Sequence, residues 1–121
     1  MVLKRRLLLD PRRSYLLLGP RRVGKSTFLK NELKPKVLID LLMSDVYFDY
    51  RNRPSLIRER FSDISGTIVV DEVQRIPELV SEVHWMLENT NARFVLSGSS
   101  ARRLRREGVT NLAGRLRTQR M

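Results

Sequence analysis

Short apolar runs alternate with longer amphipathic segments along this chain of 121 residues. The apolar runs have the length of buried strands, and the amphipathic segments repeat apolar side chains every three or four residues, as one face of a helix does. We predict strands at residues 15–18, 36–40, 67–72 and 93–97. We predict helices at residues 25–34, at residues 54–61, from Pro77 onward, and in a short segment that ends at Gly108. A loop with a possible short helix is expected at residues 41–53.

The alternation of strands and helices indicates an α/β fold. Strands joined by helices usually form a parallel sheet with right-handed crossovers. The run at residues 67–72 is apolar on both faces before it ends in two acidic residues, as a central parallel strand does at the carboxyl edge of a sheet. Ligands of such sheets bind beyond these strand ends. We therefore expect one domain over residues 14–121, preceded by a basic lead-in at residues 1–13.

Residues 19–27 fit the phosphate-binding pattern G-x-x-x-x-G-K-[ST] without a mismatch. Glycines let successive backbone N–H groups point into one concavity, and the N-terminus of the following helix adds its positive end. Lys25 is expected to reach the β- and γ-phosphates, and the Ser26 hydroxyl to ligate magnesium. A glycine-containing turn without a ligand is the alternative, but the flanking strand and helix match the motif. The expected nucleotide contacts are Gly19, Pro20, Arg21, Arg22, Val23, Gly24, Lys25, Ser26 and Thr27.

A second acidic motif, Asp71-Glu72, follows the third apolar run. Asp71 is expected to hold magnesium, directly or through water. Glu72 is expected to orient and deprotonate the attacking water. An acidic strand end that faces solvent is the alternative. The position of the pair, two strands after the phosphate-binding motif, favours the catalytic interpretation.

Five sequence blocks occur in a characteristic order. They are GPRRVGKST at 19–27, IDLL at 39–42, DEVQRIPEL at 71–79, LSGSSARRL at 96–104 and NLAGR at 111–115. Together they resemble the ATPase core of the predicted AAA-type ATPases of bacteria and archaea. The resemblance covers nearly the whole chain, and the five blocks are more specific than the phosphate-binding motif alone, which many NTPases share.

The resemblance implies a P-loop NTPase fold, a three-layer sandwich around a parallel sheet with strand order 1-4-3-2 and a fifth strand beside strand 1. Members of the family continue with this fifth strand and a long C-terminal region, whereas the sequence here ends at Met121. We therefore expect four strands, with the fifth missing and residues 15–18 at an exposed edge. A truncated fragment that binds ATP without turning it over is one alternative that follows from this expectation.

The resemblance also implies ATP as the nucleotide, a polar sensor residue after the fourth strand, and an arginine that completes the site of a neighbouring subunit in a homo-oligomer. Ser97 is the candidate sensor, with the serines at 99–100 as alternatives. Arg115 is the candidate arginine, and Arg102 and Arg103 are rivals. A solvated basic surface is the alternative for each arginine. The first functional hypothesis is thus a Mg²⁺-dependent ATPase whose catalytic residues are Glu72, Lys25, Ser97 and Arg115.

The charge of the chain suggests a second hypothesis. The formal net charge is +11. The positive excess lies in residues 1–25 and 101–121, while residues 26–100 are nearly neutral. Two basic ends are typical of a protein with an anionic partner. The second hypothesis is a nucleotide-gated module that binds nucleic acid, expected to be DNA, through these ends. Docking of a further region of the protein is the alternative.

Composition excludes several other classes. The sequence has no cysteine and one histidine, which excludes disulfides, thiolate metal sites and histidine-rich metal centres. The apolar runs are too short to span a membrane, and residues 1–13 do not fit a signal peptide. A cytoplasmic protein is therefore expected.

Overall fold

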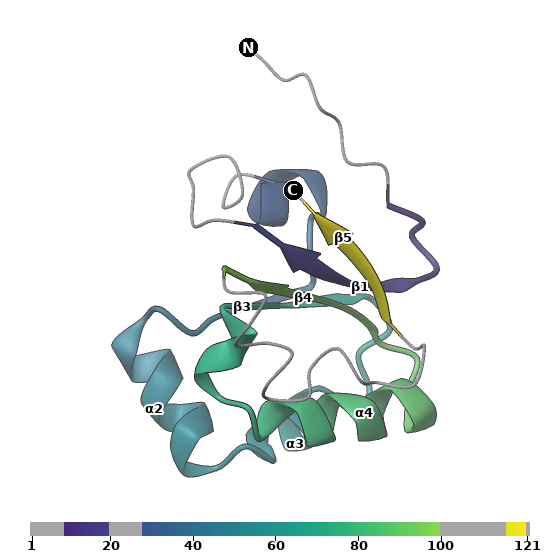
Figure 1. Ribbon diagram of the computed structural model, residues 1–121. Coiled ribbons are helices and arrows are strands. Elements are labelled where there is room, and N and C mark those ends of the chain that lie inside the picture. Colours follow the sequence, from purple (N-terminus) through teal and green to yellow (C-terminus); the bar gives the residue numbers. More distant parts are fainter. Residues whose placement is uncertain (1–8, 20–27, 100–115, 121) are drawn as a thin grey trace.

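The computed structural model describes residues 9–19, 28–99 and 116–120 (Figure 1). Its strands are β1 (Ser14–Leu18), β2 (Val37–Asp40), β3 (Thr67–Asp71), β4 (Arg93–Gly98) and β5 (Leu116–Arg120). Within the described part of the chain they form one parallel sheet of order β2-β3-β4-β1-β5. The sequence-based prediction of an α/β fold with strand order 1-4-3-2 is confirmed.

The prediction that the fifth strand is missing is wrong. β5 pairs in parallel with β1, from Ser14 opposite Leu116 to Leu18 opposite Arg120. β1 consequently has a neighbour on each side and is not the edge of the sheet. The hydrophobic pattern did not indicate β5 because its side chains are mostly polar and exposed. Such an edge strand is held by backbone hydrogen bonds to its neighbour rather than by burial of alternate side chains.

Both faces of the sheet are buried, which explains why the central strands are apolar throughout. Alternate residues of each strand point to opposite faces. Leu16 and Phe94 belong to the larger cluster, whereas Leu17 and Val95 belong to the smaller one, which also contains Leu29. Figure 1 shows α2, α3 and α4 on one side of the sheet and the turn at Phe28–Glu32 on the other. These are the three layers expected from the sequence.

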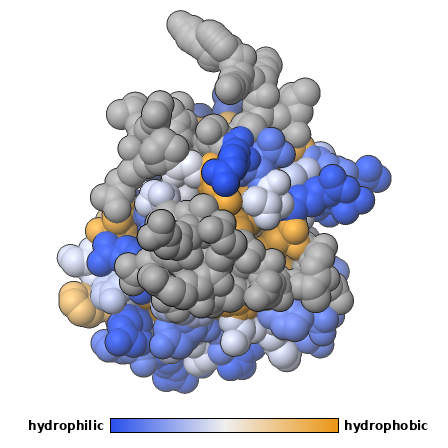
Figure 2. Space-filling view, viewed as in Figure 1, coloured by the Kyte–Doolittle hydropathy of each residue, from blue (hydrophilic) through white to orange (hydrophobic). Residues whose placement is uncertain are grey.

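The helical layer on the larger face consists of α2 (Ser44–Asn52), α3 (Leu56–Phe61) and α4 (Leu79–Asn89). α2 lies in the segment where a loop with a possible short helix was expected. α3 and α4 each begin two residues after a proline, at Pro54 and Pro77. The buried residues of α4 are Leu79, Val80, Val83 and Met86, as its apolar stripe predicts. In Figure 2 the visible outer surface of this layer is largely hydrophilic, because its apolar side chains face the sheet.

The opposite layer contains less regular structure. The described part of the helix expected at residues 25–34 is a single turn, Phe28–Glu32, in which the Leu33 N–H donates to the Phe28 carbonyl at 3.2 Å. Lys34 then adopts a left-handed conformation with φ of 47°, which ends the turn before Pro35. The short helix expected to end at Gly108 lies outside the described residues. In the described ranges no helix is long and apolar enough to cross a membrane.

Candidate active site

Three predicted site residues meet at the carboxyl edge of the sheet. Asp71, the last residue of β3, is in register with Ser97 of β4. Gly98 follows on β4 and is in register with Leu18, the last residue of β1. The N–H of Gly19, the first residue of the phosphate-binding motif, donates to the Gly98 carbonyl at 3.1 Å. The parallel pairing of β3, β4 and β1 therefore brings the start of one motif to the same edge of the sheet as the acidic end of the other, with β4 between them.

Asp71 and Ser97 form a buried pair. Asp71 is 9% exposed and Ser97 is fully buried. The Ser97 hydroxyl donates to Asp71 Oδ1 at 2.5 Å, a short distance typical of a hydrogen bond to a charged oxygen. Burial of a carboxylate is unfavourable unless hydrogen bonds or a cation compensate for lost hydration. Ser97 supplies part of this compensation and fixes the orientation of the Asp71 carboxylate.

Glu72 has an unusual backbone conformation. Its φ of 60° and ψ of 48° place it in the left-handed region, which residues other than glycine seldom adopt. Such a conformation costs about 1–3 kcal/mol and persists where the surrounding structure determines it. The left-handed residue ends β3 and starts the 3₁₀ turn Val73–Arg75, in which the Arg75 N–H donates to the Glu72 carbonyl at 3.1 Å. The chain therefore turns away from the direction of β3 at Glu72, the residue whose side chain is the candidate base.

Two donors converge on one oxygen of the Glu72 carboxylate. The Gln74 amide Nε2 donates to Glu72 Oε1 at 2.6 Å, and the Ser99 hydroxyl donates to the same oxygen at 2.9 Å. Glu72 is fully buried and Gln74 is 6% exposed. The two donors come from the turn after β3 and from the segment after β4. Glu72 is therefore held from two separate elements of the fold.

Gln74 is the residue whose role the sequence analysis missed. It was part of the DEVQRIPEL block but was given no function. A signal was present, because the uncharged polar residue Gln74 directly follows the apolar Val73, which the structure buries completely. Among the described residues, Gln74 Oε1 is a buried acceptor with no hydrogen-bond partner. An unsatisfied buried acceptor costs about 1–3 kcal/mol, so its presence calls for an explanation.

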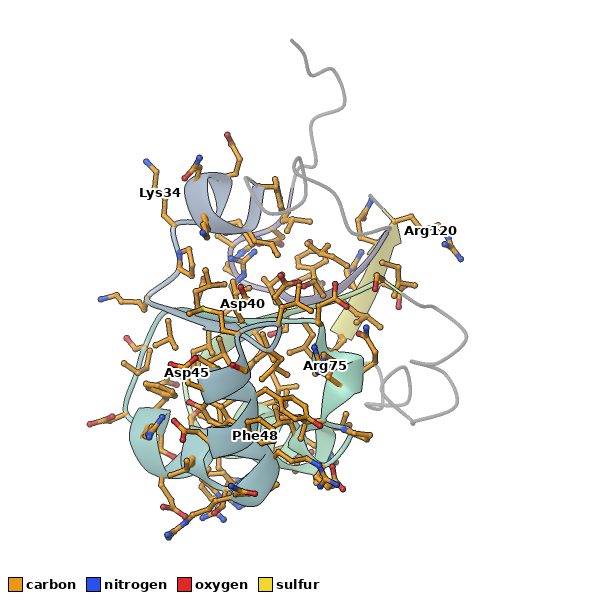
Figure 3. The ribbon with its side chains drawn as sticks, turned by 90° about the vertical axis from the view of Figure 1, so that its left-hand side faces the viewer. Lys34, Asp40, Asp45, Phe48, Arg75 and Arg120 are labelled. Atoms are coloured by element: carbon orange, nitrogen blue, oxygen red, sulfur yellow. The ribbon has the colours of Figure 1, made fainter. Side chains whose placement is uncertain are left out.

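Arg75 connects this turn to the helical layer. Its guanidinium lies 4.6 Å from the centre of the Tyr47 ring of α2, within the range of a cation–π interaction. Figure 3 looks toward the carboxyl ends of the strands and shows Arg75 between the sheet and Phe48 of α2. The turn that carries Glu72 and Gln74 is thereby held against α2.

The donor set suits Mg²⁺ bound together with a nucleotide. No cluster of three or more His, Asp or Glu side chains that could hold a metal alone occurs in the described ranges. A phosphate-bound Mg²⁺ requires few protein ligands, because phosphate oxygens and water complete its shell. The buried Asp71 carboxylate, at the same edge of the sheet as Gly19, has the chemistry of such a ligand. Its predicted partner, Ser26, lies outside the described residues.

The remaining predicted site residues are likewise not described by the structure, and their roles stay predictions. They are Pro20, Arg21, Arg22, Val23, Gly24, Lys25, Thr27, Ser100, Arg102, Arg103 and Arg115.

Comparisons with known proteins identify the family of this chain. A family profile described as an AAA domain matches residues 11–121. An uncharacterized protein of Mycobacterium bovis and one of Mycobacterium tuberculosis are each 32% identical to this chain over 108 residues. The matched region covers 84% of this chain and 23% of each relative, so the chain spans about a quarter of the length of these relatives.

The resemblance inferred from the five sequence blocks is thus confirmed, and with it the P-loop NTPase fold. Membership of this family indicates a nucleotide-binding function of the ATPase type. The chain belongs to the AAA domain family and is a P-loop ATPase-like domain of that type.

Proposed function

We propose that this domain binds ATP with Mg²⁺ and hydrolyses the ATP to ADP and phosphate. The observation that supports it most is the pair of buried acidic residues, Asp71 and Glu72, at the carboxyl edge of the sheet that also carries Gly19. Each carboxylate accepts hydrogen bonds from side chains that orient it, as a preorganised catalytic site requires. Since ATP is available in the cytoplasm, we place the activity there.

The proposed roles divide between binding and proton transfer. Lys25 and the backbone N–H groups of the loop bind the phosphates. Ser26 and Asp71 hold Mg²⁺, which when bound neutralises charge on the β- and γ-phosphates. Glu72 accepts a proton from the attacking water, and its full burial keeps bulk solvent away from the carboxylate. Ser97 orients Asp71.

Two further roles depend on the bound triphosphate and on subunit contacts. Ser97, or Ser99 next along the same edge, is proposed to respond to the γ-phosphate. The Ser97 hydroxyl reaches Asp71 and the Ser99 hydroxyl reaches Glu72, so a change at the phosphate would be transmitted to either carboxylate. Arg115 is proposed to complete the site of a neighbouring copy in a homo-oligomer.

Removal of magnesium is expected to reduce ATP hydrolysis by this chain to the background rate. Phosphate release is measured with Mg²⁺ and with excess EDTA. Asp71→Asn should lower the rate by about 10²–10³-fold, the usual effect of removing one electrostatic contact to the transition state. Asp49→Asn, an exposed change on α2, is the matched control and should leave the rate unchanged. Hydrolysis that persists in EDTA would contradict the proposed role of Mg²⁺.

A cleft at the opposite edge of the sheet favours nucleic-acid binding as a second candidate function. It has a volume of about 410 Å³ and lies at the start of β1 and β4. None of the described residues that line it is acidic, and four of them are arginines. The lining residues are Pro11, Arg12, Arg13, Ser14, Leu87, Asn91, Ala92, Arg93 and Arg117.

The arginines of this cleft differ in their roles. Arg93 builds the cleft wall, because its Nε donates to the Arg13 carbonyl at 2.8 Å and its Nη2 to the Asp10 carbonyl at 3.2 Å. Burial lowers the pKa of the Arg93 guanidinium, which nevertheless stays charged at neutral pH. Arg12 and Arg117 are exposed and are available to an anionic backbone. Arg12 also forms an ion pair with Asp10 at 3.2 Å.

Binding of a DNA duplex is expected to weaken steeply as salt concentration rises, because each phosphate contact releases counterions. Arg12→Ala and Arg117→Ala should each reduce the slope of log K against log salt by about 1. Arg51→Ala, an exposed change on α2, should leave the slope unaltered. Fluorescence anisotropy of a labelled duplex in a salt series measures this. Affinity that is indifferent to salt, or equal slopes in all variants, would argue against this second function.

A further inference from the structure

The carboxylate of Glu72 is held by a neighbour that lies only two residues away. Gln74 Nε2 donates to Glu72 Oε1 at 2.6 Å. In a continuing strand, residues two apart would lie on the same face, separated by about 6.5–7 Å along the strand. The left-handed conformation of Glu72 and the 3₁₀ turn Val73–Arg75 replace the strand at this position. The strained backbone thus coincides with the contact between the two side chains.

The contact is part of a three-residue arrangement. Ser99, in the segment directly after β4, donates its hydroxyl to the same Glu72 oxygen at 2.9 Å. One carboxylate oxygen is therefore fixed by donors from two elements, and its orientation does not depend on one side-chain rotamer alone. Ser99 also follows Gly98, whose carbonyl accepts the N–H of Gly19. The arrangement joins the candidate base to the start of the phosphate-binding motif.

Packing alone does not account for Gln74. Its side chain is nearly buried, and its Oε1 has no partner among the described residues. A methionine has similar length and would fill the space without leaving a buried acceptor unsatisfied. The unsatisfied Oε1 disfavours an amide at this position, whereas the Nε2 bond to Glu72 requires one. The two observations indicate that an amide is needed at position 74 to orient the Glu72 carboxylate.

We infer that Gln74 is a positioning residue that holds the Glu72 carboxylate in the orientation for proton abstraction from the attacking water, with Ser99 as the second donor. The inference rests on the proposed function, in which Glu72 is the base. Gln74 acts through Glu72. Its removal should therefore affect the chemical step, while the nucleotide-binding loop and the affinity for ATP stay as they are.

The first test is kinetic. Gln74→Met is expected to lower kcat by about 10–100-fold, the usual effect of losing a residue that orients a functional ligand. The KM for ATP should change by less than about twofold, because only an interaction used in the transition state is lost. Gln119→Met, the same change at an exposed site on β5, is the control. Ser99→Ala should lower kcat in the same sense, and Ser99→Thr, which keeps the hydroxyl, should restore it.

A double-mutant cycle separates positioning from a general structural role. In a Glu72→Gln background the base is absent, so Gln74→Met should cause no further loss of kcat. A structural role would lower activity or stability equally in both backgrounds. If Gln74→Met does not fold, the Ser99→Ala and Ser99→Thr variants and the ¹⁵N-glutamine NMR test described below replace it.

The second test does not require turnover. The chain contains two glutamines, Gln74 and Gln119, so selective ¹⁵N-glutamine labelling yields two pairs of side-chain NH₂ signals, one pair for each residue. The Gln74 amide protons should exchange with solvent much more slowly than those of Gln119. Glu72→Asp, which withdraws the carboxylate by one methylene, should shift the Gln74 signal and leave the Gln119 signal in place.

The outcomes distinguish the inference from the function on which it rests. Equal exchange rates for the two glutamines, or a Gln74→Met variant with the kcat of the wild type, would overturn the inference alone. A wild-type chain that binds ATP and hydrolyses none would overturn the proposed hydrolysis, and with it the catalytic consequence for Gln74. Loss of kcat at constant KM together with slow exchange supports both.

Discussion

Replacing Glu72 with glutamine is expected to reduce ATP turnover to a small residual rate and to leave ATP binding intact. An amide has the shape of the carboxylate but cannot accept the proton of the attacking water, and loss of a general base lowers rates by about 10²–10⁴-fold. The amide oxygen can still accept the hydrogen bonds from Gln74 and Ser99, so the local fold should persist. Phosphate release measures turnover, and isothermal titration calorimetry with Mg-ATP measures binding.

Glu32→Gln is the matched control for this change. Glu32 is exposed at the end of the turn Phe28–Glu32, and the substitution is the same. Its turnover and affinity should equal those of the wild type. Turnover by Glu72→Gln at the wild-type rate would remove Glu72 from the mechanism. Loss of binding together with turnover would show that Glu72 maintains the site rather than acting as a base.

Replacing Lys25 with alanine is expected to remove the stabilisation that ATP confers. A ligand at about 100 times its dissociation constant stabilises the folded state by roughly 2.7 kcal/mol, which raises the unfolding temperature of a domain of this size by several degrees. The Lys25 ammonium is predicted to neutralise phosphate charge, so its loss should cancel most of this shift. Thermal unfolding with and without saturating Mg-ATP measures the effect.

Lys30→Ala provides the comparison, because Lys30 is an exposed lysine in the adjacent turn Phe28–Glu32. It should show the full ATP-dependent shift. An equal shift in Lys25→Ala would refute the assignment of residues 19–27 as the phosphate-binding loop. A cooperative transition that ATP does not move in the wild type would exclude binding by this chain.

Much of the fold follows from local pattern. β1 to β4 were each predicted to within one residue at either end, because β1, β3 and β4 are buried almost throughout and the edge strand β2 is also largely apolar. α4 was predicted from its apolar stripe for the same reason. Asp71 and Ser97 lie together because the strand ends of a parallel sheet share one edge.

Other features do not leave a local pattern. β5 has polar, exposed side chains and depends on pairing with β1, about a hundred residues earlier in the chain. The Ser99 contact likewise joins residues 27 positions apart. Sequence reasoning could name Ser99 as a polar residue near the site but could not say which carboxylate it reaches. The left-handed conformation of Glu72 could not be predicted from the sequence either, because glutamate rarely adopts it.

The five sequence blocks supplied the family and, through that resemblance, the order of β1 to β4. Hydrophobic pattern and motif spacing were sufficient for the α/β fold and the two motifs. These features are encoded by residues close together in the chain, where apolar periodicity and glycine placement have direct physical causes. The fifth strand, and the holding of Glu72 by Gln74 and Ser99, were decided only in three dimensions. Both features depend on which distant segments of the chain become neighbours in the fold. The pattern of hydrophobic residues along the chain does not contain this information.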